Sequence, residues 1–155
     1  LYQSDNLSTI NYNQYLQQLM ESLFLSFQNK KNHVKKQIKV QNDLQINLDT
    51  AIPLGLIIAE IITNALKYAF INQAEGFVYI DLRSHIEDNR YLLKIGDNGV
   101  GLPDVQQKTK SSSLGMQLIH RLVRQLNGSI RFDSNQKGTH YHIEFCPIKD
   151  HSWLV

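Results

Sequence analysis

The sequence has little cysteine and no strong excess of charge of either sign. Its single cysteine, Cys146, excludes an internal disulfide framework and any zinc cluster built on cysteines. The 16 basic and 14 acidic side chains nearly balance, and five of the lysines fall together in residues 28–42. Because no global field points to a nucleic acid or a membrane surface, we expect neither as a direct partner. The cysteine content fits a reducing compartment, so we expect a cytoplasmic protein.

The chain also lacks a long apolar run, a targeting signal and an initiating methionine. Its longest apolar stretch, residues 51–62, is interrupted by a proline, a glycine and a glutamate. It is therefore far short of the ~18 to 20 apolar residues that cross a bilayer. Since the sequence opens at Leu1 with no basic n-region, we expect it to belong to a longer protein whose anchors or sensors lie upstream.

Two common phosphate-binding motifs are missing as well. The sequence contains neither the P-loop pattern, Gly-x4-Gly-Lys-Ser/Thr, nor the dinucleotide-binding pattern, Gly-x-Gly-x-x-Gly. Neither a P-loop enzyme nor a dinucleotide-binding fold is supported.

The 155 residues, 42% of them apolar, suffice for one domain with a sizeable core. Apolar residues at steps of three and four predict helices over residues 12–28, 50–70 and 115–127. The residues expected to bound these helices are Asn11 with Gln14, Asp49 with Pro53 in its first turn, and Gly128.

Alternation of apolar and polar residues predicts the strands. They are expected over residues 37–41, 44–48, 77–83, 90–95, 129–133 and 139–145, with a turn at Asn42 and Asp43 between the first two. Residues 102–114 have no periodicity and are predicted to form a mobile surface loop. This mixture of elements is typical of one sheet covered by helices.

The second predicted helix carries polar residues on an otherwise apolar surface. At about 100° per residue, Glu60, Asn64, Lys67 and Tyr68 fall within one arc of the helix. A solvent-facing stripe explains this spacing equally well. The residue types favour chemistry, because an amide oxygen suits Mg²⁺, a glutamate orients water or a hydroxyl, and a lysine faces phosphate.

A glycine loop and a helix start follow further along the chain. Asp97 ends a predicted strand, and Gly99 and Gly101 let the backbone turn beside a ligand, although such a sequence is also a common tight turn. Gly115 begins a helix whose free N–H groups can receive a phosphate, with hydroxyls from residues 111–113. A helix with a solvated serine cap explains these residues equally well.

In their order along the chain, these motifs closely resemble the catalytic, ATP-binding domain of sensor histidine kinases. The wider group includes gyrase B, the Hsp90 chaperones and MutL. The residues that carry the resemblance are Glu60, Asn64 and Lys67 to Phe70, then Asp97, Gly99 and Gly101, then Ser113 to Gly115, then Gly138 and Thr139. Residues 51–56 and 118–128 look most like kinases with the second type of phosphoacceptor segment.

The resemblance implies an α+β fold, a two-layer α/β sandwich whose mixed, mainly antiparallel sheet is covered by helices on one face. It places the catalytic domain at residues 11–146, with residues 1–10 as a linker to upstream phosphoacceptor helices and 147–155 as a tail. It implies ATP and Mg²⁺ as cofactors, and the upstream phosphoacceptor domain and a response regulator as partners.

The resemblance also implies a role for each site residue. Asn64 corresponds to the Mg²⁺ ligand, Glu60 to the base, and Lys67 to a phosphate contact beside Tyr68. Asp97 corresponds to the acid that reads adenine, in a loop shaped by Gly99 and Gly101. The remaining nucleotide contacts are expected at Ser113, Leu114, Gly115 and Thr139.

Two departures from the family pattern stand out. The second glycine box is reduced to Ser113, Leu114 and Gly115, and residues 102–114 contain no phenylalanine. None of the six histidines (His33, His85, His120, His140, His142 and His151) matches a phosphoacceptor segment, so we expect the acceptor upstream. A serine-directed kinase of an anti-sigma factor, an ATPase switch and a silent nucleotide-sensing module stay open as alternatives.

Overall fold

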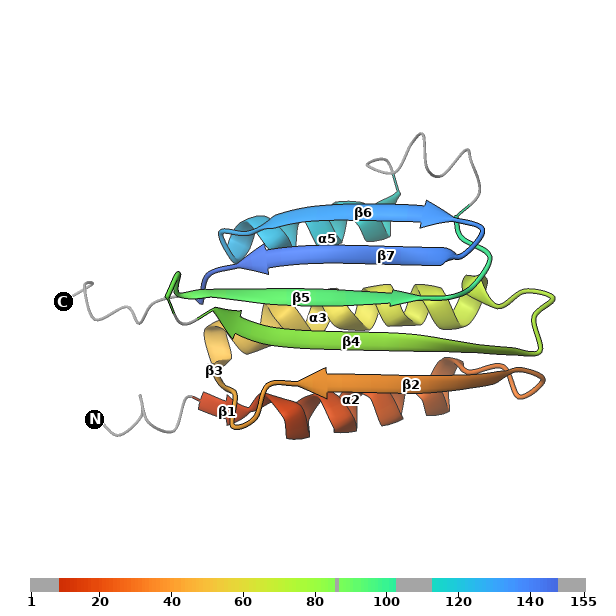
Figure 1. Cartoon of the computed structure of the whole chain (residues 1–155), viewed down its shortest axis with the longest axis horizontal. Coiled ribbons are helices and arrows are strands. Elements are labelled where there is room, and N and C mark those ends of the chain that lie inside the picture. Colours follow the sequence, from red (N-terminus) through yellow and green to blue (C-terminus); the bar gives the residue numbers. More distant parts are fainter. Residues whose placement is uncertain (1–8, 86, 103–112, 148–155) are drawn as a thin grey trace.

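The described residues form a main sheet with helices on a single face, together with a second, two-stranded sheet. A computed structural model describes residues 9–85, 87–102 and 113–147. Its main sheet has five strands in the order β2-β4-β5-β7-β6, and Figure 1 shows the helices α2, α3 and α5 behind it. The pair β2 and β4 is parallel and the other pairs are antiparallel. The predicted two-layer α/β sandwich with a mixed, mainly antiparallel sheet is confirmed.

The elements have the following bounds. The strands are β1 (Thr9–Asn11), β2 (His33–Val40), β3 (Gln45–Asn47), β4 (Glu75–His85), β5 (Arg90–Asp97), β6 (Ser129–Asn135) and β7 (Gly138–Phe145). The helices are α2 (Tyr12–Phe27), α3 (Leu48–Asn64), the π-helix η1 (Ala65–Ala69) and α5 (Leu114–Gln125). All three predicted helices and both predicted hairpins, β4 with β5 and β6 with β7, are present.

The capping predictions are confirmed for α2 and wrong for the other two helices. The Asn11 side chain accepts a hydrogen bond from the Gln14 amide, as predicted. Helix α3 is capped by Asn47, and it therefore starts early enough to put Pro53 in its second turn. Helix α5 ends at Gln125 with Leu126 as its C-cap; the left-handed residue Asn127 (φ 51°) follows, and Gly128 donates back to the Val123 carbonyl.

The two strands predicted around Asn42 and Asp43 exist but do not pair with each other. Strand β2 pairs with β4, whereas β3 pairs with β1, opposite Thr9 to Asn11. The reason is β1, a strand too short for its pattern to be recognised in the sequence. The structure thus places Thr9 and Ile10 in a strand, although residues 1–10 were assigned to a linker; that boundary stays a prediction.

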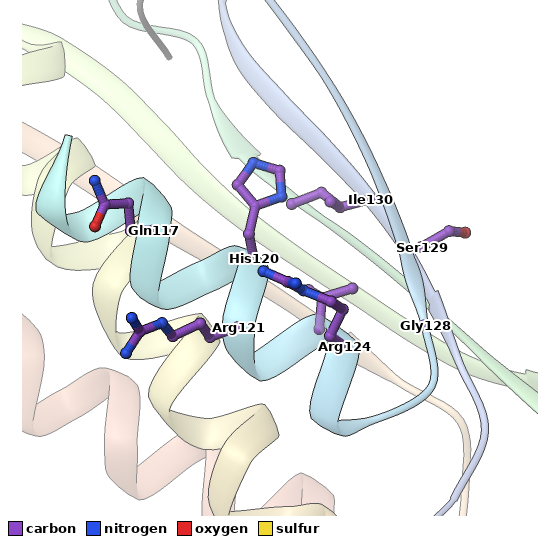
Figure 2. A pocket seen from close by; sticks show the side chains of 8 residues that line it. Gln117, His120, Arg121, Arg124, Gly128, Ser129 and Ile130 are labelled. Carbon is purple, nitrogen blue, oxygen red and sulfur yellow. The ribbon is translucent and has the colours of Figure 1, made fainter. Parts of the chain in front are cut away.

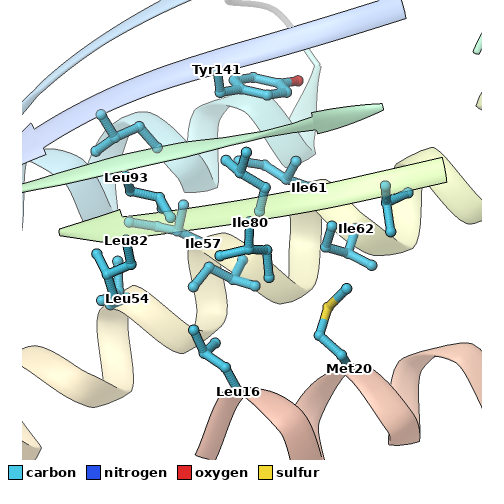
Figure 3. Packing of buried hydrophobic residues seen from close by; sticks show 14 of the residues in the cluster. Leu16, Met20, Leu54, Ile57, Ile61, Ile62, Ile80, Leu82, Leu93 and Tyr141 are labelled. Carbon is cyan, nitrogen blue, oxygen red and sulfur yellow. The ribbon is translucent and has the colours of Figure 1, made fainter. Parts of the chain in front are cut away.

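The core lies between the sheet and the helices. Figure 3 shows Leu16 and Met20 of α2 reaching toward Ile57 and Ile62 of α3, with Ile80 of β4 above them. All five side chains are buried. Since burying one such side chain stabilises a fold by ~1.5–3 kcal/mol, this cluster fixes α3 against the sheet.

Helix α3 and η1 together also meet the length and polarity of a membrane span. Within the described residues, Leu48–Ala69 is the one helical run of this kind, and 56% of its most apolar window is buried inside the domain. The run packs against both α2 and α5. Its apolar character is therefore accounted for by the core.

Candidate functional site

The predicted site residues gather at one end of the sandwich. In Figure 1 the end of α3, the end of β5 and the starts of α5 and β7 all lie toward the right of the view. Four segments far apart in the sequence therefore meet there.

Glu60, Asn64 and Gly115 lie together, as the sequence predicts. The Asn64 amide nitrogen donates to Glu60 Oε1 over 3.2 Å. A Cβ atom built on Gly115 would overlap Glu60 Oε1 and lie 3.6 Å from Asn64 Nδ2. The first turn of α5 thus lies directly against Glu60 and Asn64, which are half-buried, whereas the other two residues of the polar stripe, Lys67 and Tyr68, are exposed.

The turn after Asn64 is a π-helix, which the sequence did not predict. Turns of this kind are frequent at functional sites. The carbonyl of Ala69, at the end of η1, accepts from the Val100 amide over 2.8 Å, and a Cβ on Gly99 would overlap that carbonyl. Gly99 therefore lets the glycine loop lie against the helix end.

Lys67 and Tyr68 are exposed, whereas Glu60 and Asn64 are half-buried. The Lys67 ammonium lies 5.1 Å from the centre of the Phe27 ring on α2, in a cation–π contact. The Tyr68 side chain is 59% exposed. Both residues belong to η1, a π-helix whose turn is wider than that of a regular α-helix. Their predicted nucleotide contacts stay predictions.

Asp97 is a buried carboxylate, only 5% exposed. Its Oδ1 accepts from the Gly99 amide over 2.8 Å and from the Thr139 amide over 3.4 Å. Burial raises the pKa of Asp97, and these two N–H groups and the charge of His140 only partly oppose that shift. Since both bonds go to Oδ1, the second oxygen can accept from a ligand.

Two glycines hold the backbone around Asp97 in conformations that side chains disfavour. Gly101 has φ 79° and Gly138 has φ 122°. A Cβ on Gly138 would overlap the Asp97 carbonyl, and one on Gly101 would overlap the Asn135 carbonyl. The start of β7 can therefore approach Asp97 only without a side chain at position 138.

Helix α5 begins one residue earlier than predicted. The Ser113 hydroxyl caps it and accepts from the Met116 amide over 3.2 Å. The amides of Leu114 and Gly115 are in the first turn, at the positive end of the helix dipole. Ser113 is thus a helix cap, and the Leu114 side chain is 84% exposed. Most of the predicted loop, residues 103–112, lies outside the described residues.

Sequence reasoning missed Ser134. Its hydroxyl lies 2.8 Å from the Thr139 hydroxyl and accepts from the Leu102 amide over 2.7 Å. The one sequence signal for Ser134 was a break in the alternation of β6. Ile130 and Phe132, the preceding residues on the same face, are apolar, whereas Ser134, opposite Thr139, is polar.

A separate cavity of about 550 Å³ lies beyond these residues, between α5 and the start of β6. Figure 2 shows the side chains of His120 and Arg124 beside Ile130 there, whereas the Arg121 side chain points away from Ile130. None of the residues that line it belongs to the predicted site.

The sequence of residues 49–149 matches the family described as histidine kinase-, DNA gyrase B- and HSP90-like ATPases. The chain belongs to this ATPase family. The family recognised from the ordered motifs is confirmed, whereas the second type of phosphoacceptor segment stays a prediction. Because this is an ATPase family, ATP is the ligand of its site.

Three comparisons add detail. The chain is 29% identical over 120 residues to blue-light-activated histidine kinase 2 of Erythrobacter litoralis. The aligned residues make up 76% of this chain and 34% of that protein. It is 33% identical over 64 residues to an anti-sigma F factor of Bacillus licheniformis, 41% of this chain and 42% of that protein. The histidine kinase domain of the E. litoralis EL346 kinase superposes with a TM-score of 0.78 at 22% identity, over 88% of this chain and 61% of that one.

These comparisons define the fold and the length of the match. The solved structure shows that this ATPase domain shares the fold of a histidine kinase domain. The chain spans about a third of the E. litoralis kinase it matches. The contacts of individual residues with ATP rest on the geometry above and stay predictions.

Proposed function

We propose that this ATPase domain is the catalytic domain of a sensor histidine kinase, which transfers the γ-phosphoryl group of ATP to a histidine outside the chain. The observation that carries the proposal is the contact of Gly115 with Glu60 and Asn64. It brings the positive end of α5 to an amide and a carboxylate, a combination suited to phosphates and their metal ion. The similarity to a blue-light-activated histidine kinase supports this reading.

The adenine would lie at Asp97. The free carboxylate oxygen of Asp97 can accept a hydrogen bond from the amino group of adenine, whereas guanine presents an acceptor oxygen at that position. An unmatched buried polar pair costs about 1–3 kcal/mol, which suffices to favour ATP over GTP.

The residues present could bind Mg²⁺ only together with the phosphate oxygens of a nucleotide. The Asn64 amide nitrogen is hydrogen-bonded to Glu60, and the amide oxygen of Asn64 would serve as a hard, neutral ligand. Among the described residues, no group of three or more His, Cys, Asp and Glu side chains could hold a metal alone. Mg²⁺ would therefore be held by Asn64 and by phosphate oxygens, whose charge it neutralises.

Glu60 would act on the acceptor histidine. The acceptor nitrogen attacks the γ-phosphorus in line, the bond to the bridging oxygen of ADP breaks, and Glu60 accepts the proton that the imidazole loses. Catalysis in this scheme comes mainly from positioning and charge neutralisation.

The described histidines of the chain lie on strands of the sheet or beside the cavity next to β6. The His140 ring is bonded to the Tyr79 hydroxyl over 2.7 Å on the open face of the sheet, and His120 lines the cavity beside β6. His33, His85 and His142 lie on strands, and His151 lies outside the described residues. The acceptor histidine would therefore come from an upstream domain, and a response regulator would receive the phosphoryl group in the cytoplasm.

The proposal is tested with γ-labelled ATP. We expect the 155 residues to bind ATP and remain unlabelled, and to produce acid-labile phosphohistidine when the upstream helices of the parent protein are added. Glu60→Ala should abolish the label in that mixture. Label on one of the chain's own histidines would contradict the proposal.

The second candidate is a serine-directed kinase of the anti-sigma type, which the match to an anti-sigma F factor favours. Glu60 would then accept the proton of a serine hydroxyl. Acid-stable label on serine of a protein substrate would support this candidate over the first.

A further inference from the structure

Strand β6 forms one edge of the main sheet, since none of the described strands pairs with its outer side. The strand at the other edge, β2, carries Lys35, Lys36 and Lys39, and lysines on an edge strand discourage pairing with further chains. The one basic residue of β6 is Arg131, and Asp133 balances its charge. The β6 edge therefore lacks the protection that lysines give to the β2 edge.

The apolar side chains of β6 are incompletely covered. Ile130 and Phe132 are only partly buried, whereas the residues opposite them on β7, Ile143 and Tyr141, are buried. The cavity between α5 and the start of β6 borders Ile130. One more extended chain beside β6 would cover Ile130 and fill part of this cavity.

The α5 side of the cavity is basic. Helix α5 carries three basic side chains, His120 and Arg124 among them, and no acidic one. Figure 2 shows His120 and Arg124 beside Ile130. Within the described part of the chain, neither side chain forms an ion pair. A carboxylate that entered the cavity would complement both of them.

We propose that β6 and α5 form a docking site for an extended acidic segment of a partner protein. The segment adds a strand to β6 through backbone hydrogen bonds, because alternate N–H and C=O groups of an edge strand point away from the sheet. Every second side chain of the added strand lies on the covered side, toward His120 and Arg124, and is acidic. This surface is separate from the ATP site, so the inference does not depend on the proposed function.

The test uses a capped heptapeptide of alternating threonine and glutamate, added to the 155 residues without nucleotide and followed by NMR. We expect saturable shifts of the Ser129 and Ile130 amides, and slower hydrogen exchange of the amides on the outer edge of β6. The same peptide with lysine in place of glutamate should not bind. A peptide N-methylated at every residue keeps its charges but cannot donate backbone hydrogen bonds, so it should not bind either.

Arg124→Gln should weaken binding of the acidic peptide roughly two- to fivefold, as the loss of one exposed ion pair implies. Arg131→Gln is the matched control, because Arg131 lies on the same strand with its side chain on the opposite, uncovered face. It should change the affinity by less than about twofold. Absence of shifts at β6, equal binding of the N-methylated peptide, or a loss of affinity in Arg131→Gln instead of Arg124→Gln would overturn the inference. Since no nucleotide is present, a failure of the proposed ATP site would leave these results unchanged.

Discussion

The carboxylate of Glu60 occupies the space that a side chain at Gly115 would need. This relationship joins the polar stripe of α3 to the start of α5, and it makes position 115 sensitive to a single methyl group. Gly115 has no positive φ, so alanine fits its helical backbone.

Gly115→Ala should therefore separate binding from folding. We expect the melting temperature to change little, since the Glu60 side chain can swing aside and alanine favours the helix. ATP affinity should fall roughly tenfold, because the displaced carboxylate disturbs the phosphate and metal positions. Calorimetry and thermal unfolding measure the two effects. Equal ATP affinity in both proteins would show that this contact has no part in the site.

Asn64→Ala should remove the effect of Mg²⁺ on nucleotide affinity. The half-buried Asn64 contributes one hydrogen bond, to Glu60, so we expect a loss of stability of ~1 kcal/mol or less. Calorimetric titrations of ATP with Mg²⁺ and with EDTA give the comparison, with Asn13→Ala on the exposed face of α2 as control. If the wild type binds ATP equally in both buffers, Asn64 is not the metal ligand.

Asp97→Asn should lower ATP affinity by roughly ten- to hundredfold, the range of a lost bond to a charged group. The preference for ATP over GTP should decline with it. Competition between the two nucleotides for a fluorescent analogue gives both constants. Comparable affinities of the wild type for ATP and GTP would rule out Asp97 as the reader of the base.

The raised pKa of Asp97 also predicts a pH dependence. Burial penalises the ionised form, so the folded protein binds this proton more tightly than the unfolded chain, whose pKa is near 3.8. The contribution to stability is complete below that value and is lost as the pH rises through the raised pKa, while ATP affinity should rise over the same window. Asp97→Asn should show neither trend. Denaturant unfolding and titrations from pH 4 to 8 measure both, and parallel curves for the two proteins would contradict this.

Much of the fold could be predicted because its patterns are local. The spacing of Leu16 and Met20 marks the buried side of α2, and alternation over β4 and β5 marks a hairpin. Strand β1 could not be predicted, since its three residues are defined by pairing with β3. The π-helix could not be predicted either, because Ala65–Ala69 contains no signal for a wider turn.

The residues of the candidate site could be predicted from the sequence, but the contacts between them could not. The order of motifs located Asp97, Gly115 and Thr139, whereas the contact of Gly115 with Glu60 required the packing of α5 on α3. Ser134 was missed because a lone serine near a strand end is common, and only its register opposite Thr139 gives it a role.

The central claim is that four distant segments form one ATP site, and amide chemical shifts measured by NMR test it most directly. On addition of ATP and Mg²⁺ we expect the largest shifts at the amides of Gly99, Gly115 and Thr139 together, with saturation at one common dissociation constant. The cavity beside β6 provides the contrast, because it lies between α5 and β6 and shares none of these residues. Shifts confined to His120, Arg124 and Ser129, with Gly99, Gly115 and Thr139 unchanged, would contradict the account.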